Sequence, residues 1–204
     1  MASSEVAVYR LDIAYDGSGF RGYARQQGLR TVQGDLEAAL GTLLRAEVGT
    51  SVAGRTDAGV HARHQVVSFE HDDVADLGQL ARSLQGLVGP EIAVLGVMPA
   101  PEGFSARFSA TWRRYRYRID VSPAHDPLAR GFVWHVGRPL DLIAMRDAAS
   151  VFVGEHDFSS FCRSIEGKSN VRRLTELAVE EWSYDEVDVR VRFTATTFDR
   201  TLVS

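Results

Sequence analysis

The spacing of apolar residues divides the first hundred positions into six elements. Apolar residues occupy every second position from Glu5 to Tyr15, which predicts a strand with one buried face. Apolar residues three and four apart predict helices over residues 31–45 and 73–87, and short apolar stretches predict strands at 50–53, 65–69 and 92–98. The order strand, helix, strand, strand, helix, strand is typical of a split βαβ unit, in which two helices cover one face of an antiparallel sheet.

A second run of elements follows Pro99 and Pro101. Alternation predicts a long strand over residues 108–121, and helical spacing predicts a helix over 141–153. Two further strands are expected at 171–182 and 187–198, joined by a turn at Tyr184-Asp185-Glu186. We therefore expect an α+β protein built of two halves, residues 1–104 and residues 105–204.

Composition narrows the class of protein. The chain has 204 residues, of which 45% are apolar and 25% charged, as is ordinary for a soluble globular protein. It has no apolar run near the roughly 20 residues that span a bilayer, and its first residues lack the basic and apolar regions of a signal peptide. We expect a cytoplasmic protein with no membrane contact. A single cysteine, Cys162, excludes intrachain disulfides and cysteine-based zinc sites.

The charge is unevenly distributed. The formal net charge of −4 does not suggest a nucleic-acid partner. Residues 105–119, however, hold five arginines and no acid, whereas residues 176–188 hold six acids. For any single arginine a solvated surface position is the simpler interpretation, but the cluster favours contacts with phosphates. The basic segment therefore indicates where an RNA would bind.

A glycine-flanked turn at Gly54–Arg63 is the strongest candidate for chemistry. Asp57 lies between Arg55 and Arg63, and a carboxylate near guanidinium groups is expected to be ionised at neutral pH. It could act as a nucleophile without a separate base. On its own, Thr-Asp-Ala-Gly is also ordinary turn chemistry, because Asp bonds its own backbone and Gly supplies positive φ. Those four residues alone favour the structural interpretation.

The wider string closely resembles the signature of the tRNA pseudouridine synthases of the TruA family. Three other segments resemble family motifs in the same order along the chain. They are Tyr15–Tyr23 with Gln26 and Thr31–Glu37, then Ala106–Ala110 with Arg113–Tyr117, and then Gly154–Cys162. Four ordered matches are far more specific than one.

The resemblance implies a fold and an activity. The fold would be the pseudouridine synthase fold, two ferredoxin/RRM-like split βαβ halves that share an antiparallel sheet with a central cleft. The activity would be the isomerisation of uridine to pseudouridine in the anticodon stem-loop of tRNA, at positions 38–40. The implied partners are tRNA and a second copy of the chain, as a homodimer. No cofactor is implied, and we expect no metal, since His61 and His64 lack a clustered third ligand.

The resemblance also implies residue roles. Asp57 would be the catalytic nucleophile, attacking either the sugar or the pyrimidine ring, and Tyr115 would bind the substrate by lying against the uracil. Arg55 would fill the gap left by the extruded base or orient Asp57 through a salt bridge. Tyr117, two residues after Tyr115, could equally well be a core residue, because periodicity alone does not distinguish the two tyrosines. The phosphate contacts would come from Arg107, Arg113, Arg114 and Arg116.

The sequence departs from the family in three places, one of which is Gln85-Gly86-Leu87, where the family has an Asn-rich segment before a Leu-Pro turn. Gly22-Tyr23-Ala24 stands where the family usually has Gly-Trp-Gln, and Phe198–Ser204 lacks the arginine and the further elements expected there. We therefore expect a C-terminally shortened member with an incomplete second half. Two interpretations compete: a shortened enzyme, or a degenerate relative that binds RNA without turnover. A third, an unrelated α+β metabolic enzyme, predicts no affinity for RNA.

Overall fold

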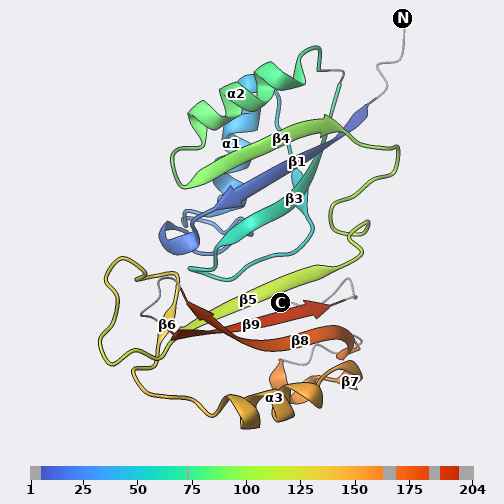
Figure 1. The fold of residues 1–204 in the computed structure, drawn as a ribbon. Helices are drawn as coiled ribbons and strands as arrows, with labels where there is room; N and C mark the ends of the chain where they lie inside the picture. The colour runs from blue at the N-terminus through green and yellow to red at the C-terminus, as the bar shows by residue number, and fades with distance from the viewer. Residues whose placement is uncertain (1–5, 73, 163–168, 184–188, 198–204) are drawn as a thin grey trace, which may run out of the picture. The chain divides into compact units, whose positions relative to one another are not determined.

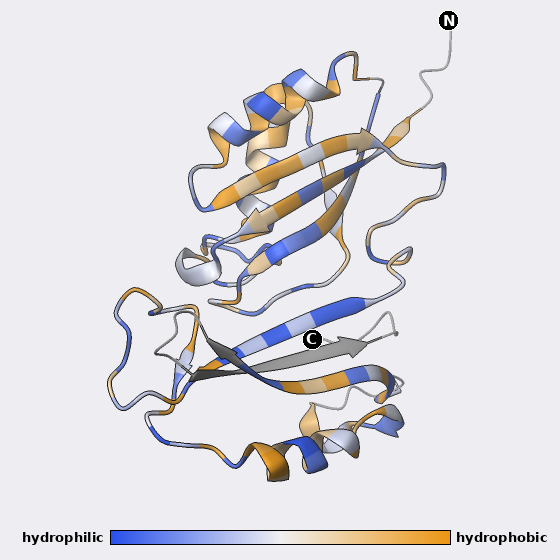
Figure 2. Ribbon diagram, in the orientation of Figure 1, coloured by the Kyte–Doolittle hydropathy of each residue, from blue (hydrophilic) through white to orange (hydrophobic). Residues whose placement is uncertain are grey.

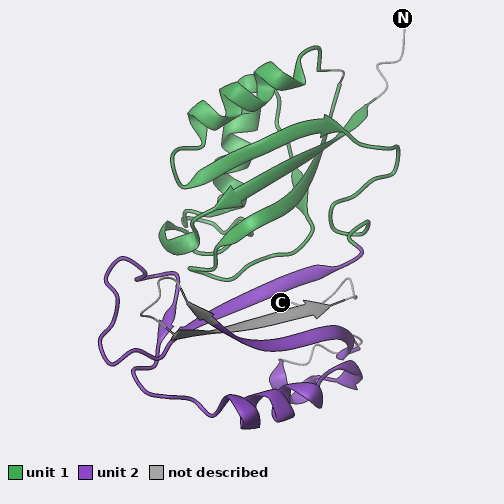
Figure 3. Ribbon diagram, viewed as in Figure 1, with its two compact units in different colours: residues 1–110, 203–204 green, residues 111–202 purple. Residues whose placement is uncertain are grey.

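The structure is a computed structural model that describes residues 6–72, 74–162, 169–183 and 189–197. It divides into two compact units, with the division after Ala110 (Figure 3). The sequence predicted a division after residue 104. None of the helices in these described ranges has the length and hydropathy of a membrane span.

The part of the first unit that the structure describes forms four strands and two α-helices. In chain order they are β1 (Ala7–Tyr15), α1 (Val32–Leu44), β2 (Thr50–Val52), β3 (Ala62–His71), α2 (Leu77–Leu87) and β4 (Ile92–Pro99). The strands form a sheet of order β2-β3-β1-β4 in which all neighbours are antiparallel. Both helices lie on one face of this sheet (Figure 1). The predicted order of elements is confirmed.

The core of the first unit lies between the sheet and its helices. Hydrophobic residues alternate with other residues along much of β1 (Figure 2), and the alternate residues Tyr9, Leu11, Ile13 and Tyr15 are buried in the core. The buried side chains from β1, α1 and α2 include Leu11, Ile13, Leu36, Leu40 and Leu84. Burying each such side chain contributes about 1.5–3 kcal/mol, so this core accounts for much of the unit's stability.

Capping side chains set where the helices begin. The hydroxyl of Thr31 accepts a hydrogen bond from Gly34 N at 3.2 Å, so α1 starts one residue inside its predicted range. The carboxylate of Asp76 accepts from Gln79 N at 2.7 Å, so α2 starts at Leu77 rather than near residue 73. The apolar pattern located both helices, and their caps fixed the boundaries.

The described residues of the second unit form five strands and one α-helix. They are β5 (Arg113–Asp120), β6 (Trp134–His135), α3 (Leu142–Ser150), β7 (Gly154–Asp157), β8 (Val171–Ser183) and β9 (Val189–Thr197). The sheet order is β6-β5-β9-β8-β7, with antiparallel neighbours except for the short parallel pair β5–β6. Ile119, Ala149 and Val179 form the centre of its small core. The described chain is thus α+β, with mainly antiparallel sheets.

The second unit differs from the sequence prediction at three strands. The strand predicted from residue 108 begins only at Arg113, because Ser105–Ser109 forms a turn in which Ser109 N donates to Ser105 O at 2.7 Å. Neither β6 nor β7 was predicted, since both are short and mostly exposed. The predicted turn at 184–186 and the segment 198–204 lie outside the described residues.

Candidate active site

Asp57 lies on the loop of residues 53–61 that joins β2 to β3, which we call the Asp57 loop. The main chain turns at this residue, since Asp57 O accepts from Val60 N at 3.2 Å and Gly59 has a φ of 79°. The side chains of Asp57 and Arg55 are both exposed. Within the described part of the chain, no hydrogen bond or ion pair joins Arg55 to Asp57. The turn thus presents a carboxylate to solvent.

Two buried side chains hold the segment that leads into Asp57, one through the Thr56 side chain and the other through a backbone oxygen. The Tyr15 hydroxyl lies 2.7 Å from Thr56 Oγ1, and Gln65 Nε2 donates to Gly54 O at 2.7 Å. Burial raises the pKa of the Tyr15 hydroxyl, although hydrogen bonds with Thr56 and Gln65 act in the opposite direction. Tyr15 therefore stays protonated at neutral pH. The backbone adds a third bond, from Tyr23 N to Thr56 O at 2.9 Å.

The glycine-rich segment after β1 packs directly against the Asp57 loop. A Cβ atom on Gly17 would lie 2.0 Å from Val60 O. Gly22 has a φ of 102°, and a Cβ atom there would lie 3.0 Å from Thr56 O. No side chain fits at Gly17 without moving the loop, and Gly22 adopts a backbone conformation that favours glycine. These glycines allow two stretches of main chain to pack closely.

His61 closes the far end of the Asp57 loop. Its Nδ1 atom lies 3.2 Å from Gly17 N, which donates to it, and 3.0 Å from Asp16 Oδ1. The Nδ1 atom can accept from Gly17 N only when it carries no hydrogen, and it can donate to Asp16 only when it carries one. Hydrogen bonds from Ser18 lower the pKa of Asp16, and the charge on His61 lowers it further.

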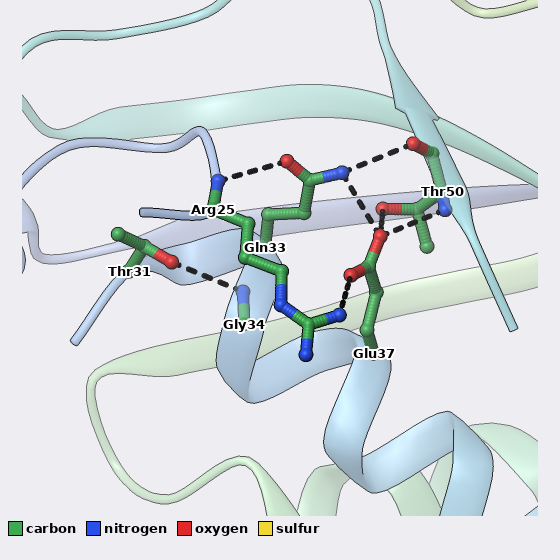
Figure 4. A network of polar contacts seen from close by, with 6 residues as sticks. All are labelled: Arg25, Thr31, Gln33, Gly34, Glu37 and Thr50. Carbon is green, nitrogen blue, oxygen red and sulfur yellow. Dashed lines mark hydrogen bonds and ion pairs between the residues drawn. The ribbon is translucent and has the colours of Figure 1, made fainter. Parts of the chain in front are cut away.

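The Thr31–Glu37 motif anchors the strand that leads into the loop (Figure 4). Glu37 Oε1 accepts from Thr50 N at 2.9 Å, from Thr50 Oγ1 at 3.0 Å and from Gln33 Nε2 at 2.9 Å. Gln33 Nε2 also donates to Thr50 O at 3.2 Å. Thr50 is the first residue of β2, so the polar positions of this motif fix α1 to β2 (Figure 4).

A charged cluster on the sheet face opposite the helices was missed by sequence reasoning. Asp12 is 7% exposed; its carboxylate accepts from Arg10 Nε at 2.7 Å and lies 3.1 Å from His64 Nε2. Burial acts to raise the pKa of Asp12, but hydrogen bonds from Arg10 and His64 outweigh it, so the pKa lies below its usual value. The only sequence signal was that Arg10 and Asp12 share the polar face of β1.

The residues predicted to bind substrate and phosphate on β5 are divided between its two faces. Tyr115 is half-buried. It lies on the same face of β5 as Arg113 and Ile119, and Ile119 packs with Ala149 of α3. Arg114 and Arg116 are exposed on the opposite face. Hydrophilic residues occupy most of β5 (Figure 2). The strand therefore does not present all of these residues on one surface.

Arg114 and Arg107, both predicted to bind phosphate, lie near aromatic rings of the chain. The guanidinium of Arg114 lies 5.6 Å from the Trp112 ring centroid and 4.0 Å from the Glu176 carboxylate. Arg107 belongs to the first unit, is exposed, and lies 5.1 Å from the Phe108 ring centroid. Its neighbour Ala106 donates from its backbone N to Ser68 Oγ at 3.0 Å, which attaches this segment to β3.

The described residues hold no group of three or more His, Cys, Asp or Glu side chains that could bind a metal ion. His61 and His64 each contact a different aspartate, Asp16 and Asp12. These two histidines thus take part in two separate polar clusters.

Comparisons with known proteins give a consistent result. A family model described as tRNA pseudouridine synthase matches residues 148–201. The chain is 49% identical over 180 residues to tRNA pseudouridine synthase A of Streptomyces griseus, covering 82% of this chain and 61% of that protein. It is 51% identical to the Frankia casuarinae protein of the same name and 45% identical to that of Cutibacterium acnes. The chain spans 61–63% of the length of these relatives.

Proposed function

The chain belongs to the tRNA pseudouridine synthase A family over the region that it shares with these relatives, and from this premise we propose that it isomerises uridine to pseudouridine in tRNA. The proposed substrate is the anticodon stem-loop, and the proposed nucleophile is Asp57.

The exposure of Asp57 on a firmly held loop is the observation that supports this proposal best. Hydrogen bonds to Gly54 O and Thr56 O fix the main chain before Asp57, while the Asp57 carboxylate remains open to solvent. A nucleophile needs this combination, since it must be accessible and also held in a defined position. An aspartate that served only the turn would direct its oxygens to nearby backbone N–H groups, as Asp16 does with Ser18 N.

The proposed reaction needs no added atoms. The carboxylate of Asp57 forms a transient covalent bond to the sugar or to the pyrimidine ring, and the bond from uracil N1 to ribose C1′ breaks. The base then rotates and C5 bonds to C1′. The bond to Asp57 breaks, and the proton lost from C5 is balanced by the one that N1 gains. The uridine must first leave its stack, at a cost of a few kcal/mol, and Arg55 would fill the vacated space.

Tyr115 and the arginines complete the proposed site. An aromatic side chain stacked on a base contributes about 1–3 kcal/mol, which suits Tyr115 for holding the uracil. Arg107, Arg113, Arg114 and Arg116 would contact the tRNA backbone. A sheet shared between the halves, a central cleft and assembly into a homodimer are the remaining parts of the proposal.

Incubation of the purified chain with unmodified tRNA, followed by detection of pseudouridine, tests this function. We expect product at uridines of the anticodon stem-loop. Absence of product from folded protein that still binds tRNA with a salt-dependent affinity would favour the degenerate RNA-binding relative. Absence of any affinity for tRNA would favour the unrelated metabolic enzyme. Sedimentation at two protein concentrations tests the homodimer.

A further inference from the structure

We propose that Tyr15 is a positioning residue for the reaction, acting through Thr56 to hold the Asp57 carboxylate where the substrate meets it. This inference rests on the proposed function. Tyr15 is the last residue of β1, and its hydroxyl lies 2.7 Å from the side chain that immediately precedes Asp57.

The Tyr15 side chain is packed tightly enough to hold the Thr56 side chain in one position. It is 5% exposed, and its ring lies 6.2 Å from that of Tyr23, which is 1% exposed. A side chain packed in this way has few alternative rotamers, so its hydroxyl keeps one position. Burial also raises the pKa of the hydroxyl, which keeps its proton available for a hydrogen bond across the neutral range.

The contact differs in kind from the others that hold the loop. The bond from Tyr23 N to Thr56 O and the bond from Gln65 Nε2 to Gly54 O both hold backbone atoms. Among the described residues, only the Tyr15 contact restrains the Thr56 side chain, and with it the rotation of the chain about Thr56. Because Asp57 is exposed and its carboxylate has no hydrogen-bond partner among the described residues, its direction depends on this restraint.

The same strand offers a matched control. Tyr9 is also buried on β1, at 3% exposure, and its hydroxyl accepts from Val74 N at 2.9 Å. That bond holds the chain between β3 and α2, away from the Asp57 loop. Tyr9→Phe therefore removes an equivalent hydroxyl from the same sheet without touching Thr56.

The experiment compares Tyr15→Phe, Thr56→Val, the double variant and Thr56→Ser with Tyr9→Phe and the unsubstituted chain. Turnover on unmodified tRNA gives kcat and KM. We expect Tyr15→Phe and Thr56→Val each to lower kcat by about tenfold with KM within about twofold, because a small misplacement of a reacting group slows chemistry more than binding. The double variant should be no slower than either single variant, and Thr56→Ser should recover most of the rate.

A second readout is independent of activity. Amide hydrogen exchange at Tyr23 and Val60 reports on the loop, since Tyr23 N donates to Thr56 O and Val60 N donates to Asp57 O. Exchange at both amides should be faster in Tyr15→Phe and unchanged in Tyr9→Phe. A wild-type chain without turnover would reject the proposed function and would leave exchange to decide whether Tyr15 holds the loop. The positioning role would be overturned if the losses of kcat in Tyr15→Phe and Thr56→Val added up in the double variant. It would also be overturned if Tyr9→Phe lost as much kcat as Tyr15→Phe, or if amide exchange in Tyr15→Phe were unchanged.

Discussion

Gly17 lies so close to Val60 that a Cβ atom on Gly17 would come within 2.0 Å of the Val60 carbonyl oxygen. The glycine-rich segment after β1 and the Asp57 loop are thus packed main chain against main chain. Glycine at this position is required by the loop that carries the proposed nucleophile.

Gly17→Ala should displace the Asp57 loop. A contact of 2.0 Å with backbone cannot be relieved by a side-chain rotation, so we expect a loss of about 1–3 kcal/mol in the free energy of unfolding and a clear fall in turnover. Gly86→Ala in α2 is the control, because a Cβ atom there meets nothing within 4 Å. It should leave stability unchanged or raise it by up to about 1 kcal/mol. Equal effects of the two substitutions in urea unfolding would contradict this account.

The charged cluster around Asp12 should make stability depend on pH in the acid range. The pKa of Asp12 is lowered in the folded protein, so its ionised form adds stability above the unfolded-state value of 3.8, and this stability disappears as the pH falls through the folded pKa. Asp12→Asn should therefore be less stable than the wild type near pH 7, and the difference should shrink below about pH 4. A difference that stays constant from pH 7 to pH 2 would exclude this linkage.

Thr31 should contribute to stability through its cap. Thr31→Ala removes the acceptor for Gly34 N and should lower the free energy of unfolding by about 0.5–2 kcal/mol. Thr42 lies on the same helix, exposed, and its hydroxyl donates to Ala38 O. Thr42→Ala should be neutral or slightly stabilising, because Ala is the better helix former. Chemical denaturation measures the free energy of unfolding of both variants. If Thr31 did not cap α1, Thr31→Ala would be no less stable than Thr42→Ala.

Arg116 should contribute one phosphate contact. It is exposed on β5 on the face opposite Tyr115, and Arg116→Ala should weaken tRNA binding and make the salt dependence of the affinity shallower by about one ion. Arg82 on α2 is an exposed arginine outside the basic segment, so Arg82→Ala should leave the slope unchanged. Binding measured over a range of salt concentrations compares the two. Equal slopes for Arg116→Ala and the wild type would remove Arg116 from the proposed interface.

The sequence predicted the elements of the first unit well because one face of each is buried. Leu36 and Leu40 in α1, or Leu11 and Ile13 in β1, repeat at the period of their element, since every one of them faces the same core. The strand β7 has exposed polar residues and no such period, so it was not predicted. The turn at Ser105–Ser109 was missed because it is held by a backbone bond and by the Ser109 hydroxyl, which accepts from Ser105 N, and neither bond depends on hydrophobic spacing.

The contacts that hold the candidate site could not be predicted from the sequence. The motif around Asp57 identified the residue, but no spacing rule indicates that Tyr15, 41 positions away, would reach Thr56. Asp12 and His64 are on paired strands, and their contact follows from register that only the fold defines. Alternation along β5 was visible in the sequence, yet the division of Tyr115 from Arg114 and Arg116 has a meaning only once the packing of Ile119 with Ala149 shows which face lies toward α3.

The role of Asp57 can be measured most directly with Asp57→Asn, which keeps the shape of the side chain and removes its charge. Glu70→Gln is the matched control, because Glu70 is an exposed carboxylate on β3. We expect Asp57→Asn to lower turnover on unmodified tRNA by at least about 1,000-fold while tRNA affinity changes by no more than about threefold, since a carboxylate does not neutralise phosphate. Glu70→Gln should turn over like the wild type. Pseudouridine formation by Asp57→Asn at a rate close to that of the wild type would contradict the assignment of Asp57 as the nucleophile.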